Sequence, residues 1–196
     1  MENGHGFLEI NPRQLDDNPF QLIGYSWFLM TAEKNGVPNA MTVAWGGLGY
    51  MWGKPALFVA VRPERYTFEF MEAADTFSLT AFEDTPANRK MLVYFGTVSG
   101  RDEPKIAKSK LTVIYDGPTP YFAESRLSFS CKKIMGTVFQ PEELLDQNYA
   151  KFYGGANTKN GLGGGYHTLY IAHLTRVLVK EGAVVRPMPK KGSLTP

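Results

Sequence analysis

The sequence predicts a mainly β fold, an antiparallel barrel with a few short helices on its outside. Seven runs combine apolar or alternating patterns with many β-branched and aromatic residues. Clusters of Gly, Pro, Asn and Asp separate these runs, as turns separate strands. The expected strands cover residues 22–31, 41–45, 56–61, 76–81, 111–115, 127–134 and 167–174.

The first two expected strands should form a hairpin. Asn35 and Gly36 stand between them. An Asn-Gly pair readily takes the positive φ angles of a tight hairpin turn, so we expect it to join the two strands directly.

Three segments carry helix signals. A helix is expected over 66–74, and Thr85 is expected to cap a second helix over 86–95. A third, over 141–152, opens with a proline followed by two glutamates in its first turn. All three are short and should pack on the outside of the barrel.

The remaining segments favour irregular structure. The two ends, 1–18 and 186–196, are expected to be extended or frayed. The glycine-rich run 154–165 is expected to be a mobile loop that leads to His167.

Size and composition fit one domain spanning residues 1–196, with its core over about 20–175. The net charge of +2 gives no electrostatic basis for nucleic-acid binding. Cys131 is the single cysteine and alternates with core positions, so we expect a buried thiol and not a nucleophile. No signal-peptide pattern or long apolar stretch is present, which predicts a cytoplasmic protein that does not enter a membrane. His167 and His173 lie six positions apart in one expected strand, too far apart to bind one metal ion, and His5 lies in the N-terminal segment.

The segment 41–45 is expected to be a strand with one bulky and one small face. Met41, Val43 and Trp45 point to one side, and Thr42 and Ala44 point to the other. The two glycines that follow allow close approach to the backbone. A planar ring could lie against this surface.

Cationic and hydroxyl side chains gather just after the next strand, in Arg62-Pro63-Glu64-Arg65-Tyr66-Thr67. Guanidinium groups, a hydroxyl and a helix N-terminus are groups that bind phosphate. The alternative is that Arg62 and Arg65 pair with nearby carboxylates on a solvated surface. The chain has neither a GxxxxGK[ST] nor a GxGxxG sequence, so a P-loop or a Rossmann-type dinucleotide site is not expected.

Three motifs in order resemble the flavin reductase-like family of FMN-binding split β-barrel proteins. They are the N-x-M-T-x-x-W-G strand 39–46, the R-P-x-R-Y-T turn 62–67 and the S-G-R-D-x-x-K loop 99–105. The likeness runs from about residue 24 to about residue 174. It implies a split β-barrel with antiparallel, Greek-key strands and a few short peripheral helices.

The resemblance also implies a set of FMN-binding residues. It places Arg62, Tyr66, Thr67, Ser99 and Lys105 around the phosphate and ribityl chain, and Thr42, Val43, Ala44 and Trp45 along the isoalloxazine ring. The set is Asn39, Met41, Thr42, Val43, Ala44, Trp45, Arg62, Arg65, Tyr66, Thr67, Ser99, Gly100 and Lys105. For Lys105, a solvated helix residue near Asp102 and Glu103 is the alternative.

His167 is the candidate catalytic residue. It matches a position where many split-barrel flavin reductases have a G-D-H sequence whose histidine meets the reduced nicotinamide; here the residues are Gly165-Tyr166-His167. The alternative is a histidine at a strand end that is hydrogen-bonded to backbone.

The resemblance therefore implies an FMN-binding flavoprotein oxidoreductase, an NAD(P)H-dependent flavin reductase that works as a homodimer. Hydride transfer between two rings needs no protein nucleophile, which agrees with the lack of a recognisable catalytic triad. The alternative is an FMN-binding carrier, sensor or partner subunit without reductase turnover. A barrel that stacks single-stranded nucleic acid is disfavoured because no basic stripe is present.

Overall fold

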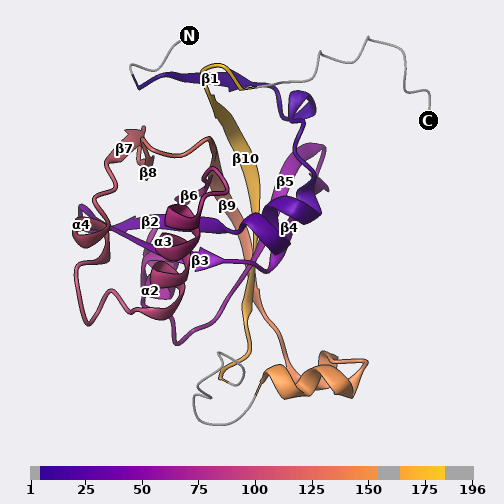
Figure 1. Ribbon diagram of the computed structural model, residues 1–196. Helices are drawn as coiled ribbons and strands as arrows, with labels where there is room; N and C mark the ends of the chain where they lie inside the picture. Colours follow the sequence, from indigo (N-terminus) through magenta and orange to yellow (C-terminus); the bar gives the residue numbers. More distant parts are fainter. Residues whose placement is uncertain (1–4, 154–163, 184–196) are drawn as a thin grey trace, which may run out of the picture.

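The fold is built on one large antiparallel sheet, as the computed structural model shows for residues 5–153 and 164–183 (Figure 1). The strands are β1 (Phe7–Ile10), β2 (Phe28–Lys34), β3 (Val37–Val43), β4 (Gly46–Met51), β5 (Lys54–Val61), β6 (Thr76–Ala81), β7 (Val113–Asp116), β8 (Thr119–Phe122), β9 (Leu127–Val138) and β10 (Thr168–Lys180). The main sheet runs in the order β3-β2-β6-β9-β10-β5-β4, with β1 added to the end of β10, and β7 and β8 form a separate hairpin.

Short helices cover one side of this sheet. The α-helices are α1 (Pro19–Gln21), α2 (Tyr66–Ala73), α3 (Pro86–Thr97) and α4 (Lys105–Ser109). Further helical turns are the 3-10 segments Pro12–Gln14, Pro141–Glu143 and Gln147–Phe152 and the π-helical segment Leu22–Ser26. Figure 1 shows α2, α3 and α4 together on one side, whereas the 3-10 segments that follow β9 project away from the main body.

The two ends of the main sheet meet at a corner of the chain. β3 and β4 are the outermost strands of the hydrogen-bonded order, yet they follow each other in sequence with only Ala44 and Trp45 between them. The Trp45 carbonyl accepts a hydrogen bond of 3.0 Å from the amide of Ala60, which ties the corner to β5. The opening of the barrel therefore lies beside Trp45.

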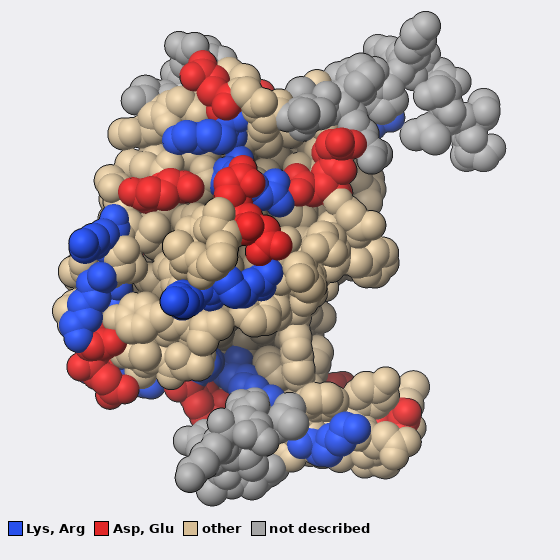
Figure 2. All heavy atoms as spheres, viewed as in Figure 1, with Lys and Arg blue, Asp and Glu red and all other residues tan. Residues whose placement is uncertain are grey.

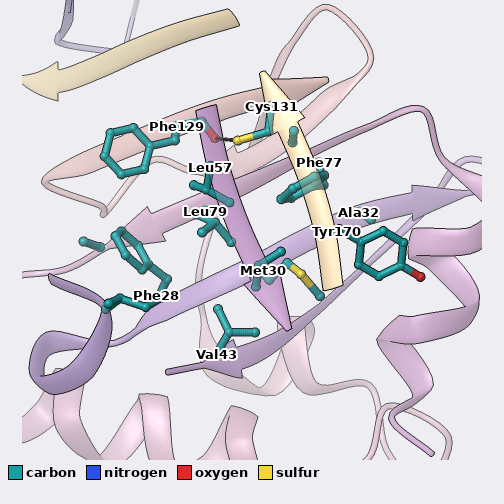
Figure 3. Packing of buried hydrophobic residues seen from close by; sticks show 14 of the residues in the cluster. Phe28, Met30, Ala32, Val43, Leu57, Phe77, Leu79, Phe129, Cys131 and Tyr170 are labelled. Atoms are coloured by element: carbon teal, nitrogen blue, oxygen red, sulfur yellow. Dashed lines mark hydrogen bonds between the residues drawn. The ribbon is translucent and has the colours of Figure 1, made fainter. Parts of the chain in front are cut away.

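The core fills the inside of the curved sheet. Met30, Leu57, Leu79 and Phe129 come from four different strands and are fully buried (Figure 3). Cys131 lies in the same cluster, where burial raises the pKa of its thiol. The expectations of a mainly β fold and of a buried cysteine are confirmed.

Several expected elements are found where the pattern places them. β6 has the predicted bounds, α2 lies within one residue of them, and Thr85 caps α3 by accepting a hydrogen bond from the Asn88 amide. Asn35 and Gly36 both have positive φ and join β2 to β3, so the hairpin prediction is confirmed.

The expected strand 22–31 is wrong in its first half. Asn18 caps a short helix, its side chain accepting from the amides of Phe20 and Gln21, and the chain continues helically to Ser26. β2 then begins at Phe28. The side-chain cap ahead of Pro19 starts a helix that the apolar pattern alone does not indicate.

The expected strand 41–45 is also incorrect at its end. β3 stops at Val43, and Trp45, which was placed on the core face, is 40% exposed. A new strand, β4, starts at Gly46 and was missed. The glycines interrupt the alternation that identifies strands, so the sequence pattern reads as a turn.

Three smaller corrections concern the periphery. The segment 1–18, expected to be frayed, contains β1, which pairs with β10. The helix expected over 141–152 is two separate 3-10 segments. β8 was not predicted. The tail 186–196 and residues 154–163 of the glycine-rich run lie outside the described residues.

No helix among residues 5–153 and 164–183 has the length and apolar character needed to cross a membrane.

Candidate functional site

Two cations, the buried Lys105 and the half-buried Arg65, meet at the end of α3. Lys105, the first residue of α4, is 3% exposed, and its Nζ donates to the Phe95 carbonyl at 3.2 Å. Arg65, which precedes α2, donates from Nη2 to the same carbonyl at 3.4 Å. Burial, with a smaller contribution from the nearby Arg65 cation, lowers the pKa of Lys105 to about 8. Burial and then Arg62 lower the pKa of Arg65 as well.

The local partners do not balance this charge. Within residues 5–153 and 164–183, neither Arg65 nor Lys105 forms an ion pair with a carboxylate. The Phe95 carbonyl belongs to the C-terminal turn of α3, where the helix dipole amounts to roughly half a negative charge. The Glu64 carboxylate at the same site adds one negative charge, so about half a positive charge remains in excess, which suits an anion.

A cavity of about 120 Å³ opens onto these cations. Seven residues of the predicted set line it: Met41, Arg65, Tyr66, Thr67, Ser99, Gly100 and Lys105. The volume suits a compact anion and is well below the roughly 300 Å³ at which pockets for drug-sized ligands begin. Any larger ligand must extend beyond this cavity.

Gly100 and Asn39 shape the wall of the cavity. A Cβ on Gly100 would lie 2.5 Å from Asn39 Oδ1 and 2.9 Å from Tyr66 Cδ1. Asn39 is buried and donates from Nδ2 to Thr67 Oγ1 at 2.8 Å. Asn39 therefore orients the Thr67 hydroxyl, and only glycine at position 100 lets the loop backbone come this close.

Arg62 is placed differently from Arg65. Its guanidinium donates to the carbonyls of Phe152 at 2.9 Å and Gly165 at 3.5 Å. It also lies over the rings of Trp45 and Tyr153, at 6.0 and 5.8 Å from their centroids. Arg62 thus belongs to an aromatic cluster beside the cavity and is not among the residues lining it.

His167 is at the centre of that cluster. Its ring lies 4.8 Å from the Trp45 ring and 5.6 Å from the Tyr153 ring. The residue is 5% exposed, and its Nδ1 has no hydrogen-bond partner among the described residues. Burial, with a further contribution from the Arg62 cation, lowers the pKa of His167 to about 4. The imidazole is therefore neutral at pH 7, and its buried Nδ1 is left without a hydrogen-bond partner among the described residues.

A match to known proteins agrees with this geometry. The model of the flavin reductase like domain matches residues 21–189. The chain belongs to the flavin reductase-like family. No curated protein sequence matched the chain in a direct comparison.

Solved structures of this family share the fold. The chain is similar to flavoredoxin from Methanosarcina acetivorans, with 19% identity, a TM-score of 0.62 and coverage of 92% of this chain and 80% of that one. It is also similar to an FMN-binding domain of a flavin reductases-like enzyme from Shewanella baltica OS155, with 18% identity, a TM-score of 0.61 and coverage of 89% and 77%. Flavoredoxin of Desulfovibrio vulgaris gives 22% identity, a TM-score of 0.58 and coverage of 79% and 69%. The fold is accordingly the split β-barrel expected from the motifs.

The predicted site residues of β3, and the two that follow it, differ in how far they are buried. Met41 and Val43 are buried, and Val43 belongs to the barrel core. Thr42 Oγ1 donates to the Leu92 carbonyl of α3 at 2.5 Å. Ala44, at the open corner, is half-buried like Thr42, and Trp45 is exposed. The roles predicted for this strand remain predictions.

Sequence reasoning missed two neighbours of the site, Arg101 and Phe152. Arg101 stacks on the Tyr66 ring at 4.8 Å and pairs with Glu69 at 2.5 Å. Phe152 contacts Trp45 edge-on, with centroids 5.4 Å apart, and Tyr153 stacks on Tyr166. Arg101 stands inside a quoted motif and could have been considered, whereas Phe152 has no local signal.

The buried His167 predicts a distinct acid dependence of stability. Its folded pKa of about 4 lies below the ordinary value of 6.5, so the unfolded chain binds more protons between these values. The free energy of unfolding should therefore fall as the pH drops from about 6.5 to about 4, by up to about 1.4 kcal/mol per pH unit from this group. Urea unfolding of the native chain and of His167→Gln measures it. Equal slopes for the two proteins in this window would contradict the burial of a neutral imidazole.

Proposed function

We propose that this chain is an FMN-binding flavoprotein oxidoreductase, an NAD(P)H-dependent flavin reductase that works as a homodimer. The observation that carries the proposal is the pair of the buried Lys105 and the half-buried Arg65, which has excess positive charge and opens onto a phosphate-sized cavity. The family of the chain and the FMN-binding proteins of the same fold support a flavin monophosphate as the anion.

The residues of the cavity fit the phosphate of FMN. Lys105 and Arg65 would supply charge-assisted hydrogen bonds, and the Ser99-Gly100 backbone would come close because position 100 has no Cβ. Thr67, oriented by Asn39, would add a hydroxyl. The phosphate of FMN carries a charge close to −2. It would therefore offset the excess positive charge at Arg65 and Lys105.

The open corner of the barrel fits the flavin ring. Trp45 is exposed there and Ala44 is half-buried. Arg62 connects this corner to the cavity, because it lies over the Trp45 ring and lowers the pKa of Arg65, which lines the cavity. Bound FMN would accept hydride from nicotinamide at its ring system, and the protein would supply orientation and exclusion of water. The neutral His167 would border the nicotinamide without adding charge.

A second copy of the chain would cover apolar surface on the projecting part. Ile134, Met135 and Val138 of β9 are each between 42% and 48% exposed, and Leu145 is fully exposed. The end of β9 and the 3-10 segments that follow it project below the main body (Figure 1). Apolar side chains gathered in this way are typical of protein interfaces. By contrast, basic and acidic side chains are interspersed over the face shown in Figure 2, which offers no continuous basic track for a nucleic acid.

Purification and a nicotinamide titration test the proposal. The protein should acquire a flavin absorption spectrum with added FMN, and anaerobic NADH or NADPH should bleach the bound flavin. Flavin binding without bleaching by either nicotinamide would indicate the carrier or sensor alternative. Failure to bind FMN at all would refute both.

A further inference from the structure

The turn that carries Arg62 and Glu64 is in direct contact with the segment leading to His167. A Cβ on Gly165 would lie 2.8 Å from Glu64 Oε1 and 2.8 Å from Pro63 Cγ. Gly164 has a φ of +123°, and a Cβ there would lie 3.0 Å from Arg62 Nη1. Side chains at these two positions would push the segment away from the turn.

Hydrogen bonds fix both peptide groups of Gly165 to this turn. The Gly165 amide donates to Glu64 Oε1, and the Gly165 carbonyl accepts from Arg62 Nη1 at 3.5 Å. Glu64 also lines the cavity that contains Arg65 and Lys105. Its carboxylate is therefore shared between a cationic cavity and the backbone of the histidine segment.

A carboxylate at this position is unfavourable for anion binding, because a negative charge beside the cations repels a phosphate. The hydrogen bond to Gly165 gives it another use. Two residues further on, His167 packs against Trp45 with centroids 4.8 Å apart, and its carbonyl accepts from the Phe139 amide at 2.9 Å. With Gly165 anchored on one side and β10 beginning at Thr168 on the other, little freedom remains for the imidazole.

We propose that Glu64 is a positioning residue for His167: by accepting the Gly165 amide, its carboxylate holds the imidazole against Trp45 at the open corner of the barrel. The proposal rests on the proposed function for its catalytic consequence, but not for its structural one. Glu64 touches neither ring of the proposed reaction and acts through the backbone of residues 165–167.

The protonation of His167 reports this contact without any cofactor. Three effects determine the pKa of the imidazole: burial and the Arg62 cation lower it, and the Glu64 carboxylate raises it. Tyr153, whose pKa is itself raised by burial, meets the same ring edge-on. Loss of the Glu64 charge alone would lower the histidine pKa further, whereas release of the ring into water would raise it toward 6.5. The sign of the change separates the two effects.

NMR titration of the three histidines, with His167→Gln used for assignment, is the experiment. Glu64→Ala should raise the pKa of His167 from about 4 toward 6.5. Glu64→Gln keeps an oxygen acceptor for the Gly165 amide, so the pKa should stay at about 4 or fall. Glu69→Gln is the matched control, since Glu69 pairs with Arg101 and Lys34 and forms no hydrogen bond or ion pair with residues 164–167. An unchanged or lowered pKa in Glu64→Ala would overturn the proposal.

Gly165→Ala tests the same contact from the other side. The added methyl should displace the segment and reproduce the rise in the pKa of His167, while leaving Glu64 in place. In turnover, Glu64→Ala and Gly165→Ala should lower kcat/KM for the nicotinamide about tenfold or more, while the Kd for FMN stays within about twofold or tightens. Glu64→Gln should retain turnover. If the protein does not bind FMN, the proposed function fails, and the NMR result still decides the role of Glu64.

Discussion

Gly46→Ala is expected to cause the largest loss of stability of any single methyl addition at the site. Gly46 has a φ of +155°, and an added Cβ would overlap the Phe58 carbonyl oxygen and lie 3.1 Å from its carbon. Phe58 is in β5, whose backbone is held by β4 on one side and β10 on the other, so it cannot move aside cheaply. We expect a loss of about 3–5 kcal/mol in the free energy of unfolding, measured by urea denaturation.

The neighbouring glycine provides the control. An added Cβ on Gly47 meets no atom within 4 Å, and its φ is not positive. Gly47→Ala should therefore change the free energy of unfolding by no more than about 0.5 kcal/mol. Similar losses for the two variants would show that the corner after Trp45 is not shaped as described.

Lys105→Met is expected to produce the largest loss of ligand affinity. A hydrogen bond to a charged group contributes about 1.5–3 kcal/mol, which corresponds to a roughly tenfold to 150-fold weaker Kd for FMN, measured by flavin fluorescence. Stability should move the other way. Burial disfavours the charged lysine, as its lowered pKa shows, so an apolar side chain of similar length should leave the melting temperature unchanged or raise it.

Lys108→Met is the matched variant for this test. Lys108 lies three positions further along α4, is exposed and pairs with Glu103. Its loss should change neither the Kd for FMN nor, beyond the small contribution of a surface pair, the stability. A weak binder that is also unstable would suggest that Lys105 is needed for folding and not for the ligand.

Much of the fold could be predicted because its signals are local. The Asn35-Gly36 turn, the cap at Thr85 and the alternation in β6 each depend on a few adjacent residues. The missed parts depend on interactions across the chain. β4 starts with glycines, and its position is set by pairing with β5, which the pattern of residues 46–51 does not reveal.

The candidate site divides in the same way. The motifs correctly brought 62–67 and 99–105 together, since residues from both line one cavity. The motifs did not indicate that Arg65 lines the cavity and that Arg62 does not. Arg65 reaches the Phe95 carbonyl 30 positions away, whereas Arg62 reaches carbonyls 90 and 103 positions away. Which of two nearby guanidinium groups faces the cavity is decided by these distant partners, and an R-P-x-R sequence contains no information about them.

The comparison of FMN with riboflavin tests the central claim most directly, because the two ligands share a ring and a ribityl chain and differ by the phosphate. The native protein should bind FMN far more tightly than riboflavin, and the difference should collapse in Lys105→Met, with riboflavin affinity unchanged. Equal affinities of the native protein for the two ligands would contradict a phosphate site at Arg65 and Lys105.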